Sequence, residues 1–531
     1  MTTTNRRVYP FLTLALASTI AIGAALAVCC ALGGAVSATA ALGGELHVCP
    51  SGCSYASVQA AVNAAEPGDV IKVAQGTYTD IHVRDGVTQV VYISKTVTVL
   101  GGYTTTNWTT PNPLGQVTTL DAQGQGRVLV VSDTSGVTLE GLAITGGDAT
   151  DLKGSGPDLS AGGGLYAIHA PSLTVSGCDI YSNSARTKGQ CCGHGGGLHL
   201  FLSDNARVEE STIRDNWGNR DGIGKGGGLY LEYCDRAVLR GNSIAGNTGD
   251  SANGRGGGLY ARRCDDALID SNVFSGNVAT PDADGRGGGA YLSSCNRMKL
   301  TASTFRDNVG SGCCWGYGGA IGIEGGSQVV LDSNVIVGNA TSNHPSSTGF
   351  AGGGLFLDNA DVTIVNTVVA DNTAGARGSA VYASDSSPRF LHSTIARNTG
   401  GDGSAIYVTD EYGAASRVAF TNTIIFSHTV GITVTAGHTA TLDGTLWYAN
   451  GTNTGGAGTI DIGAVNVYGD PAFSADGYHL TSESAAIDAG VDSRLSSDID
   501  GDPRPSGTGF DVGADEVFRG HIFLPIVLRA W

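Results

Sequence analysis

Short apolar stretches separated by glycine-rich turns recur along most of the chain. From Gly226 to Asn247, three such stretches follow one another: Gly-Gly-Gly-Leu-Tyr-Leu, then Ala-Val-Leu, then Ser-Ile-Ala-Gly-Asn. Each stretch is too short for a helix of about 10 residues. Brief apolar runs bounded by turn residues are typical of β-strands. The pattern therefore predicts three short strands in each unit.

The unit repeats, and two markers advance along the chain together. One marker is a glycine-rich start, and successive starts are 33, 31, 30, 31, 30, 35, 25 and 25 residues apart. These starts lie at Gly162, Gly195, Gly226, Gly256, Gly287, Tyr317, Gly352, Arg377 and Asp402. The other marker is an asparagine three residues after an apolar residue, found at Asn183, Asn216, Asn247, Asn277, Asn308, Asn339, Asn372 and Asn398. Because both markers keep the same period, each repeat is one structural unit.

Three brief strands per unit, coil upon coil, predict an all-β solenoid, a right-handed parallel β-helix. In such a fold each coil pairs its backbone with the coils above and below, about 4.8 Å away. Identical side chains then stack, so we expect Asn216, Asn247, Asn277 and Asn308 to form an amide ladder. His428 takes the asparagine position in a degenerate ninth copy. The glycines are expected to supply turns with positive φ.

A short amphipathic segment precedes the first strands. Residues 57–65 place four apolar side chains on one helical face, namely Val58, Ala61, Val62 and Ala65. Pro67-Gly68 then stops the helix. The segment predicts an N-terminal capping helix that covers the open apolar end of the solenoid.

Five segments follow from these patterns. Residues 1–40 are predicted to be a signal peptide, because Arg6 and Arg7 precede an apolar run that ends near the A-x-A site at residues 38–40. The run is also long enough to span a bilayer, so an uncleaved N-terminal anchor remains the alternative. The other segments are the cap and first coils (41–161), the glycine-rich β-helix repeats (162–465), a C-terminal module (466–516) and an apolar tail (517–531).

Composition and charge narrow the class of protein. Glycine accounts for 82 of 531 residues but shows no period of three, which excludes collagen. Hydrophobic residues make up 41% of the chain and are regularly placed, which argues against disorder. The net charge of −18 argues against a nucleic-acid partner. Together with the export signal, this composition favours a secreted or cell-surface protein.

The cysteines suggest an oxidising compartment, given the export signal. Cys49 and Cys53 flank a three-residue turn, which predicts a small disulfide loop. Cys234, Cys264 and Cys295 occupy equivalent places in three successive coils. Stacked coils would bring them within disulfide reach, but a ladder of small buried thiols is the arrangement we favour.

The repeats resemble a known family. Gly318-Gly-Ala-Ile321, the Gly-Gly-Gly-Leu copies, Phe274-Ser-Gly-Asn277 and Phe305-Arg-Asp-Asn308 are similar to the paired repeats of polymorphic outer-membrane proteins. The resemblance covers about residues 162–428. It implies a surface-displayed, adhesin-like protein with a β-helical passenger.

The C-terminal part resembles the terminal module of secreted bacterial β-helix proteins called choice-of-anchor. The motifs that carry this resemblance are Asp470-Pro-Ala-Phe473, Tyr478-His-Leu480, Ser484-Ala-Ala-Ile-Asp-Ala-Gly490, Asp498-Ile-Asp-Gly-Asp-Pro-Arg504 and Asp511-Val-Gly-Ala514. The resemblance implies that the module closes the solenoid and precedes a sorting tail. Residues 522–529 are the candidate tail, although we favour a final strand that covers the last coil.

Catalysis finds little support in the sequence. Many β-helices of the pectin-lyase-like fold are polysaccharide lyases or glycoside hydrolases. Gly193-His194-Gly195 matches a fragment of the polygalacturonase signature, but the Asn-Thr-Asp of that signature is absent, and Asp265-Asp266 follows the histidine instead of preceding it. Inverting hydrolysis needs two carboxylates about 6.5–9.5 Å apart. The feature that most favours a lyase is a set of arginines beside these aspartates: Arg255, Arg262, Arg263 and Arg286.

A recurring aromatic position is the candidate binding site. The fifth residue of the repeat is aromatic in five copies, at Tyr166, Tyr230, Tyr260, Tyr291 and Phe356. Its neighbours on both sides are almost all Leu or Ala, so alternation along a strand turns the rings away from the core. We predict a carbohydrate-binding platform of stacked rings. A stack covered by the glycine-rich loops fits the pattern equally well.

The acidic turn at Asp498, Asp500 and Asp502 is the candidate metal site. Carboxylates at alternate positions suit calcium, which would be the one cofactor. A solvated loop in which Asp502 pairs with Arg504 accounts for the pattern equally well.

Taken together, the sequence predicts a secreted or cell-surface β-helix that is non-catalytic, adhesin-like, and binds a surface polysaccharide or a partner protein. The alternatives are a polysaccharide lyase or glycoside hydrolase, and a structural envelope protein. We expect no nucleic-acid partner, and membrane attachment only through an uncleaved N-terminal segment or the sorting tail.

Overall fold

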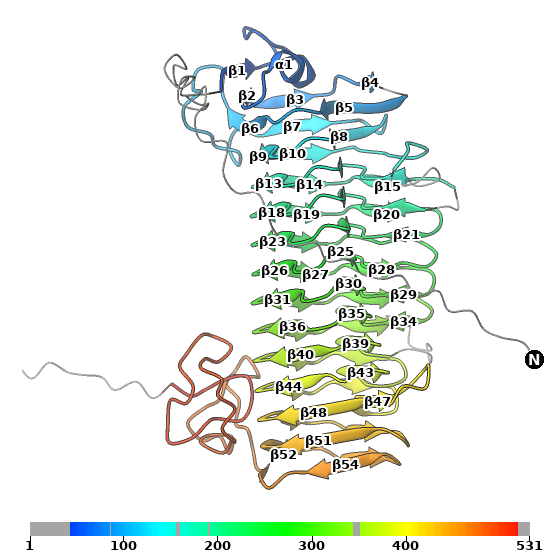
Figure 1. The fold of residues 1–531 in the computed structure, drawn as a ribbon, viewed down its shortest axis with the longest axis vertical. Helices are drawn as coiled ribbons and strands as arrows, with labels where there is room; N and C mark the ends of the chain where they lie inside the picture. The colour runs from blue at the N-terminus through cyan, green and yellow to red at the C-terminus, as the bar shows by residue number, and fades with distance from the viewer. Residues whose placement is uncertain (1–42, 85, 155–159, 190–191, 343–350, 519–531) are drawn as a thin grey trace, which may run out of the picture. The chain divides into compact units, whose positions relative to one another are not determined.

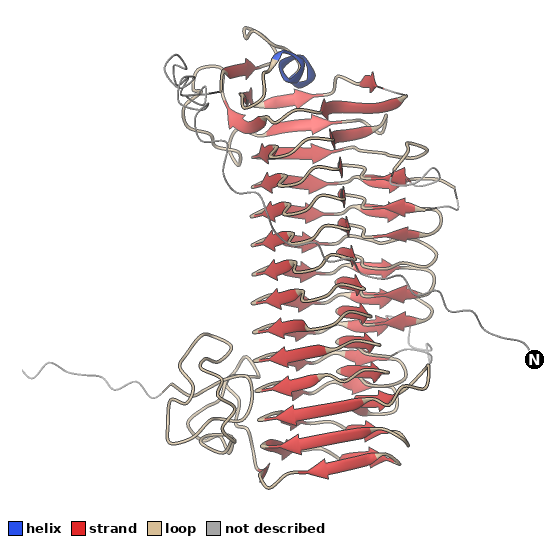
Figure 2. Cartoon of the chain, in the orientation of Figure 1, coloured by secondary structure: helices blue, strands red, loops and turns tan. Residues whose placement is uncertain are grey.

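The computed structural model describes residues 43–84, 86–154, 160–189, 192–342 and 351–518. Over these residues short strands stack coil on coil into three long sheets (Figure 1, Figure 2). Every strand pair is parallel except β4–β5. The only helix in the described part is α1 (Val58–Ala64). The all-β parallel β-helix with a short N-terminal helix is therefore confirmed. No helix among the described residues is long and apolar enough to cross a membrane.

Within each long sheet the strands pair with their neighbours in chain order. The first long sheet contains β1 (Glu45–Val48), β2 (Val70–Ala74), β6 (Thr98–Tyr103), β9 (Thr138–Glu140), β13 (Thr174–Ser176), β18 (Arg207–Glu209), β23 (Val238–Arg240), β26 (Leu268–Asp270), β31 (Lys299–Thr301), β36 (Val329–Asp332), β40 (Val362–Val365), β44 (Arg389–Leu391), β48 (Arg417–Thr421), β51 (Thr439–Asp443) and β54 (Thr459–Ile462). The second contains β3 (Gly76–Tyr78), β7 (Thr118–Asp121), β10 (Leu142–Thr145), β14 (Asp179–Tyr181), β19 (Thr212–Arg214), β24 (Ser243–Ala245), β27 (Val273–Ser275), β32 (Thr304–Arg306), β37 (Val335–Val337), β41 (Val368–Ala370), β45 (Thr394–Ala396), β49 (Ile424–Phe426), β52 (Thr445–Tyr448) and β55 (Asn466–Tyr468). The third contains β4 (His82–Arg84), β5 (Val87–Ile93), β8 (Arg127–Ser132), β12 (Leu165–Ile168), β17 (Leu198–Phe201), β22 (Leu229–Glu232), β25 (Leu259–Arg262), β30 (Ala290–Ser293), β35 (Ile321–Glu324), β39 (Leu355–Asp358), β43 (Val381–Ser384), β47 (Ser404–Thr409), β50 (Val430–Val434) and β53 (Thr452–Gly456).

Short sheets lie in the loops that connect strands of the second long sheet to strands of the third. They contain β11 (Ser160–Ala161), β16 (Gly193–His194) and β21 (Gly224–Lys225); β15 (Ser184–Arg186) and β20 (Trp217–Asn219); β28 (Val278–Thr280), β33 (Val309–Ser311), β38 (Ala340–Ser342), β42 (Thr373–Ala374) and β46 (Thr399–Gly400); and β29 (Gly285–Arg286) and β34 (Gly316–Tyr317).

The register of the third sheet follows the repeat. Leu229 pairs with Leu259, and Leu259 pairs with Ala290, so equivalent repeat positions lie directly above one another. The apolar fourth and sixth positions of each repeat consequently stack inside the solenoid. They belong to one continuous buried cluster that runs from the first coils to Trp447.

Helix α1 covers the start of this core, as the sequence predicts. The hydroxyl of Ser57 accepts a hydrogen bond from the Ala60 N–H and caps the helix. At the other end Lys95 donates to the carbonyl of Ala65, at 2.7 Å. The four apolar residues of the predicted face are all buried in the core cluster: Val58, Ala61, Val62 and Ala65.

The predicted asparagine ladder is present and continuous. Each side-chain amide donates to the next Oδ1 at 2.9–3.1 Å, through Asn183, Asn216, Asn247, Asn277, Asn308, Asn339, Asn372 and Asn398. Each also donates to a main-chain carbonyl of the preceding coil, as Asn277 does to Ile244. His428 follows Asn398, with its Nε2 3.3 Å from the Asn398 amide nitrogen. A second, shorter ladder, which was not predicted, includes Asn242 and Asn272.

The glycine-rich starts need glycine for two reasons. Gly287 has φ +64°, and a Cβ there would lie 2.2 Å from the carbonyl oxygen of Ala290. Gly288 has no such φ, but its Cβ would lie 2.4 Å from the carbonyl oxygen of Val309. Glycine thus permits both the turn and the close approach of neighbouring coils.

The cysteines follow the sequence expectations in part. Cys49 and Cys53 form a disulfide. Cys234, Cys264 and Cys295 are buried free thiols, and the sulfur of Cys264 accepts from the Cys234 N–H at 3.4 Å. An unexpected disulfide joins the adjacent Cys313 and Cys314.

Residues 470–517 contain no helix or strand and pack against the flank of the late coils. Asn366 donates to the Ser497 carbonyl, and the Thr394 hydroxyl accepts from the Ala514 N–H, both at 3.0 Å. Inside this module Arg504 and Glu516 form a buried ion pair at 2.9 Å. The resemblance implied that this module closes the end of the solenoid. These contacts instead place the module beside the coils that contain strands β41, β45 and β49. The predicted signal peptide (1–40) and candidate tail (522–529) lie outside the described residues.

Replacing Asn277 with leucine should lower stability measurably. The change leaves the amide of Asn247 without its acceptor and the Ile244 carbonyl without its donor, in a fully buried position. We expect a loss of about 1–3 kcal/mol, measured as a shift of the denaturant midpoint. Lys299→Leu introduces the same side chain at an exposed strand position and is the control. Equal midpoints for the two variants would contradict a stabilising ladder.

Candidate functional site

The predicted aromatic stripe forms stacks outside the main core. Tyr230 and Tyr260 have ring centroids 4.9 Å apart, and Tyr260 and Tyr291 lie 5.8 Å apart, with interplanar angles of 23° and 21°. These three rings form a cluster separate from the solenoid interior. Alternation along the strand therefore turns the rings away from the core, as expected.

The stripe is nevertheless covered, which corrects the expectation of an exposed platform. The exposed fractions of the predicted residues are 5% for Tyr166, 1% for Tyr230, 1% for Tyr260, 0% for Tyr291 and 1% for Phe356. Burial also raises the pKa of Tyr166 to about 12. The second arrangement, a stack beneath the glycine-rich loops, is the one observed. These rings present no open face on which a sugar could stack.

Cations lie directly over the buried rings. The amino group of Lys225 is 5.4 Å from the Tyr260 centroid, and the guanidinium of Arg255 is 5.5 Å from that of Tyr291. The guanidinium of Arg286 likewise lies 5.2 Å from the ring centroid of Tyr317, which is half-buried. Such contacts are favourable because the ring face is electronegative.

These cations stand in one row across three coils. The main chain of Lys225 forms a parallel β-bridge with that of Arg255, and Arg255 forms another with Arg286. Arg286 in turn pairs with Tyr317 on β34. Burial, then the neighbouring Arg255 and Arg262, lower the pKa of Lys225. We call Lys225, Arg255 and Arg286 the cationic row.

The cationic row ends in a groove lined by an exposed tryptophan and a half-buried tyrosine. The groove encloses about 230 Å³ and is lined by Asn253, Gly254, Arg255, Asp284, Arg286, Trp315 and Tyr317. Trp315 is 57% exposed. The carboxylate of Asp284 accepts a hydrogen bond from the main-chain N–H of Trp315 at 3.0 Å and stabilises this turn. Trp315 directly follows the Cys313–Cys314 disulfide in the chain.

One carboxylate partly balances two arginines in this groove. Glu324 Oε2 lies 3.7 Å from Arg255 Nη1 and 3.6 Å from Arg286 Nη1, and it also contacts the Tyr291 hydroxyl. Both arginine side chains keep 34% of their surface exposed. Their unused N–H donors can therefore bind an anionic group from solvent.

The other residues considered for catalysis do not join this groove. Arg262 pairs with Glu232 at 2.7 Å, and Arg263 donates to the Tyr233 hydroxyl. Asp265 accepts from Asn296, and Asp266 pairs with Arg297. His194 lies buried in the short strand β16, where burial lowers its pKa to about 3. The four arginines considered for a lyase thus separate into two pairs with different partners.

The predicted calcium residues do not converge, which corrects that expectation as well. Asp498 is buried, and its oxygens accept from the main-chain N–H groups of Asp500, Asp502 and Glu516. Its carboxylate therefore shapes the turn. The alternative pairing of Asp502 with Arg504 is also absent, because Arg504 binds Glu516 instead.

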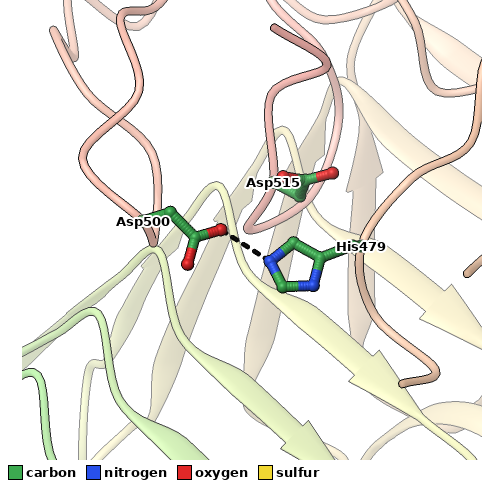
Figure 3. A group of neighbouring side chains, drawn as sticks. All are labelled: His479, Asp500 and Asp515. Carbon is green, nitrogen blue, oxygen red and sulfur yellow. Dashed lines mark hydrogen bonds and ion pairs between the residues drawn. The ribbon is translucent and has the colours of Figure 1, made fainter. Parts of the chain in front are cut away.

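Asp500 instead lies beside two residues that were not predicted as ligands. His479 and Asp515 come from separate loops and approach Asp500 (Figure 3). Burial opposes the charged form of His479, but hydrogen bonds to Asp476 and Asp500 outweigh it and raise its pKa to about 9. Burial raises the pKa of Asp515 to about 6.

Trp315 and Tyr317 were also missed as candidate site residues. Tyr317 was recognised only as an atypical repeat start, where most other copies have glycine. The available signal was that a tyrosine, close to a tryptophan, takes the place that a cation holds in the preceding coils.

The family that the chain matches agrees with this fold. The family model of the right-handed beta helix region matches residues 115–254 and 250–411, more than half of the chain. No curated protein matches this chain. Similar solved structures include pectate lyase Pel9A (13% identity, 89% of this chain and 96% of that chain, TM-score 0.35) and PfbA, a surface adhesin of Streptococcus pneumoniae (12%, 67% and 88%, 0.38). The Agl-KA catalytic domain is also similar (12%, 76% and 64%, 0.38), and this chain spans less than two thirds of its length.

Tyr260→Ala should destabilise the fold, because the ring is buried between Tyr230 and Tyr291. Removing a buried aromatic ring leaves a cavity and costs about 3–5 kcal/mol. Chemical unfolding measures the change, and Tyr412→Ala, at a position 77% exposed, is the control. If Tyr260→Ala unfolded at the wild-type midpoint, the ring would not be part of the packed structure.

Proposed function

The chain belongs to the right-handed β-helix family, and from that premise we propose that it binds an acidic polysaccharide without cleaving it. The polymer lies along the cationic row and ends in the groove at Trp315 and Tyr317. The protein acts outside the cell or at its surface, in keeping with the export signal predicted at residues 1–40 and the resemblance of its repeats to adhesin-like surface proteins.

The observation that carries this proposal is the in-register stacking of three cations. Like charges on adjacent strands repel one another, and the protein as a whole carries a net charge of −18. A row of positive side chains in such a protein favours a negatively charged ligand. Because Arg255 and Arg286 present planar groups with several N–H donors, they suit carboxylates.

The aromatic residues at the end of the row add contacts of a different kind. Trp315 and Tyr317 offer an apolar ring face together with a polar hydrogen-bonding edge. The groove also contains Asn253 and Asp284, which can hydrogen-bond to hydroxyl groups. A sugar ring presents both kinds of surface, so this lining supports a polysaccharide over a small inorganic anion.

A polymer suits the row better than a single sugar. Adjacent coils repeat at about 4.8 Å, so the cations contact successive parts of an extended chain. Each contact is weak by itself, and several coils that engage one polymer raise the apparent affinity. Binding by charge also implies that affinity falls as the salt concentration rises.

A polysaccharide lyase or hydrolase is the second candidate. Asp284 and Glu324 place carboxylates next to the two arginines, and this is the observation that favours chemistry at the groove. Both groups already bind protein partners, Asp284 the Trp315 N–H and Glu324 the arginines. We therefore assign them to the shaping of the groove.

A double substitution, Arg255→Ala with Arg286→Ala, should weaken binding of uronic-acid polymers. Losing charge-assisted hydrogen bonds worth about 1.5–3 kcal/mol lowers affinity roughly 10- to 100-fold. Calorimetry on a polymer chosen from a glycan array measures this change. Arg306→Ala removes an arginine that is exposed on another sheet, and it should bind like the wild type.

Two results would contradict the proposal. Unaltered affinity in the double variant would remove the cationic row from the site. Release of unsaturated or reducing ends from the polymer by the wild-type protein would show that the protein cleaves the polysaccharide.

A further inference from the structure

A second cluster of polar side chains lies in the C-terminal module, far in sequence from the cationic row. The Nε2 of His479 lies 2.5 Å from an oxygen of Asp500. One ligand atom from each of His479, Asp500 and Asp515 lies within 4.8 Å of the other two. Figure 3 shows the two carboxylates beside the same imidazole, each from its own loop.

The carboxylates of this cluster outnumber the cationic group that they face, His479. Asp476 contacts the other ring nitrogen, Nδ1, so three carboxylates surround one imidazole. Asp515 is more than nine-tenths buried, at 7% exposure, and accepts a hydrogen bond from the Leu480 N–H. Among the described residues no lysine or arginine lies within ion-pair distance of Asp476, Asp500 or Asp515. His479, whose pKa is raised to about 9, is the one cationic group that faces these three carboxylates among the described residues, so an excess of negative charge remains that a bound cation would reduce.

The histidine is oriented as a metal ligand. Histidines that bind metals donate their other ring N–H to a carboxylate, which fixes the tautomer and the direction of the ring. Asp476 is in place to accept from Nδ1 of His479. Nε2 then faces Asp500, and its lone pair becomes available to an ion once its proton is lost.

We propose that His479 Nε2, Asp500 and Asp515 bind a divalent cation of the zinc class, with Asp476 orienting the histidine. One nitrogen and two carboxylate ligands suit zinc, which takes three protein ligands and a water molecule in open sites. Calcium and magnesium prefer sites made of oxygen ligands alone. Any proton on Nε2 passes to solvent when the ion binds.

Binding would join loops that no regular structure connects. The three ligands come from separate turns of a module that has no helix or strand in its described residues. An ion that holds these turns together stabilises the folded module, because the site does not exist in the unfolded chain. This role is separate from polysaccharide binding at the cationic row.

Calorimetry on the full chain, stripped of metal and then titrated with Zn²⁺, tests the proposal. We expect one equivalent of Zn²⁺ to bind at this site and to raise the thermal unfolding midpoint. His479→Ala and Asp515→Asn should each lose that equivalent. Asp476→Asn should weaken binding about 10- to 100-fold, the usual effect of removing an outer-shell partner. Asp502→Asn, in the neighbouring acidic turn, should bind like the wild type.

A readout on the wild type alone keeps the test independent of how the variants fold. Co²⁺ in the site should give visible absorption bands, and Zn²⁺ should abolish them by displacement. No bands in the wild type, undiminished Zn²⁺ binding in His479→Ala, or tighter binding of Ca²⁺ than of Zn²⁺ would each overturn the assignment.

Discussion

Backbone pairing between successive coils, kept in register by stacked asparagines, is the interaction on which the rest of this structure depends. Each ladder amide donates both to the asparagine of the next coil and to a carbonyl of the preceding one. A shift of one repeat position would leave these buried groups unpaired, at a cost of about 1–3 kcal/mol each. The ladder therefore specifies the register as well as contributing to stability.

The same register decides where functional groups lie. Equivalent repeat positions stack, so any residue that recurs in the sequence becomes a row on the surface or in the interior. The buried tyrosines and the cationic row are two such rows, separated by the glycine-rich turn that folds one over the other. Where a different type of residue interrupts such a row, the surface changes locally and a binding site can form. Tyr317 follows Arg286 in the row and lines the groove together with Trp315.

Much of the fold could be predicted from the sequence because its determinants are local or periodic. The helix at residues 57–65, the asparagine ladder and the place of His428 all follow from spacing alone. The aromatic stripe was only half predictable: alternation correctly turned Tyr260 away from the core, but whether a loop covers it depends on how the turn at Lys225 folds back. The spacing of the aspartates misled for a related reason, since Asp498 binds main-chain N–H groups of its own turn. The grouping of His479 with Asp500 and Asp515 depends on how three separate loops pack, and no period in the sequence encodes it.

The central claim is that a rigid stack of coils presents the cationic row to an acidic polymer, and amide hydrogen exchange tests it most directly. The full chain is compared with and without a saturating uronic-acid oligosaccharide. The account predicts slow exchange at Asn247, Asn277 and Asn308 in both samples, because their main-chain N–H groups donate to buried ladder oxygens. It also predicts new protection confined to the turns around Arg255, Arg286 and Trp315. Fast exchange along the ladder, or protection that appears only away from those turns, would contradict it.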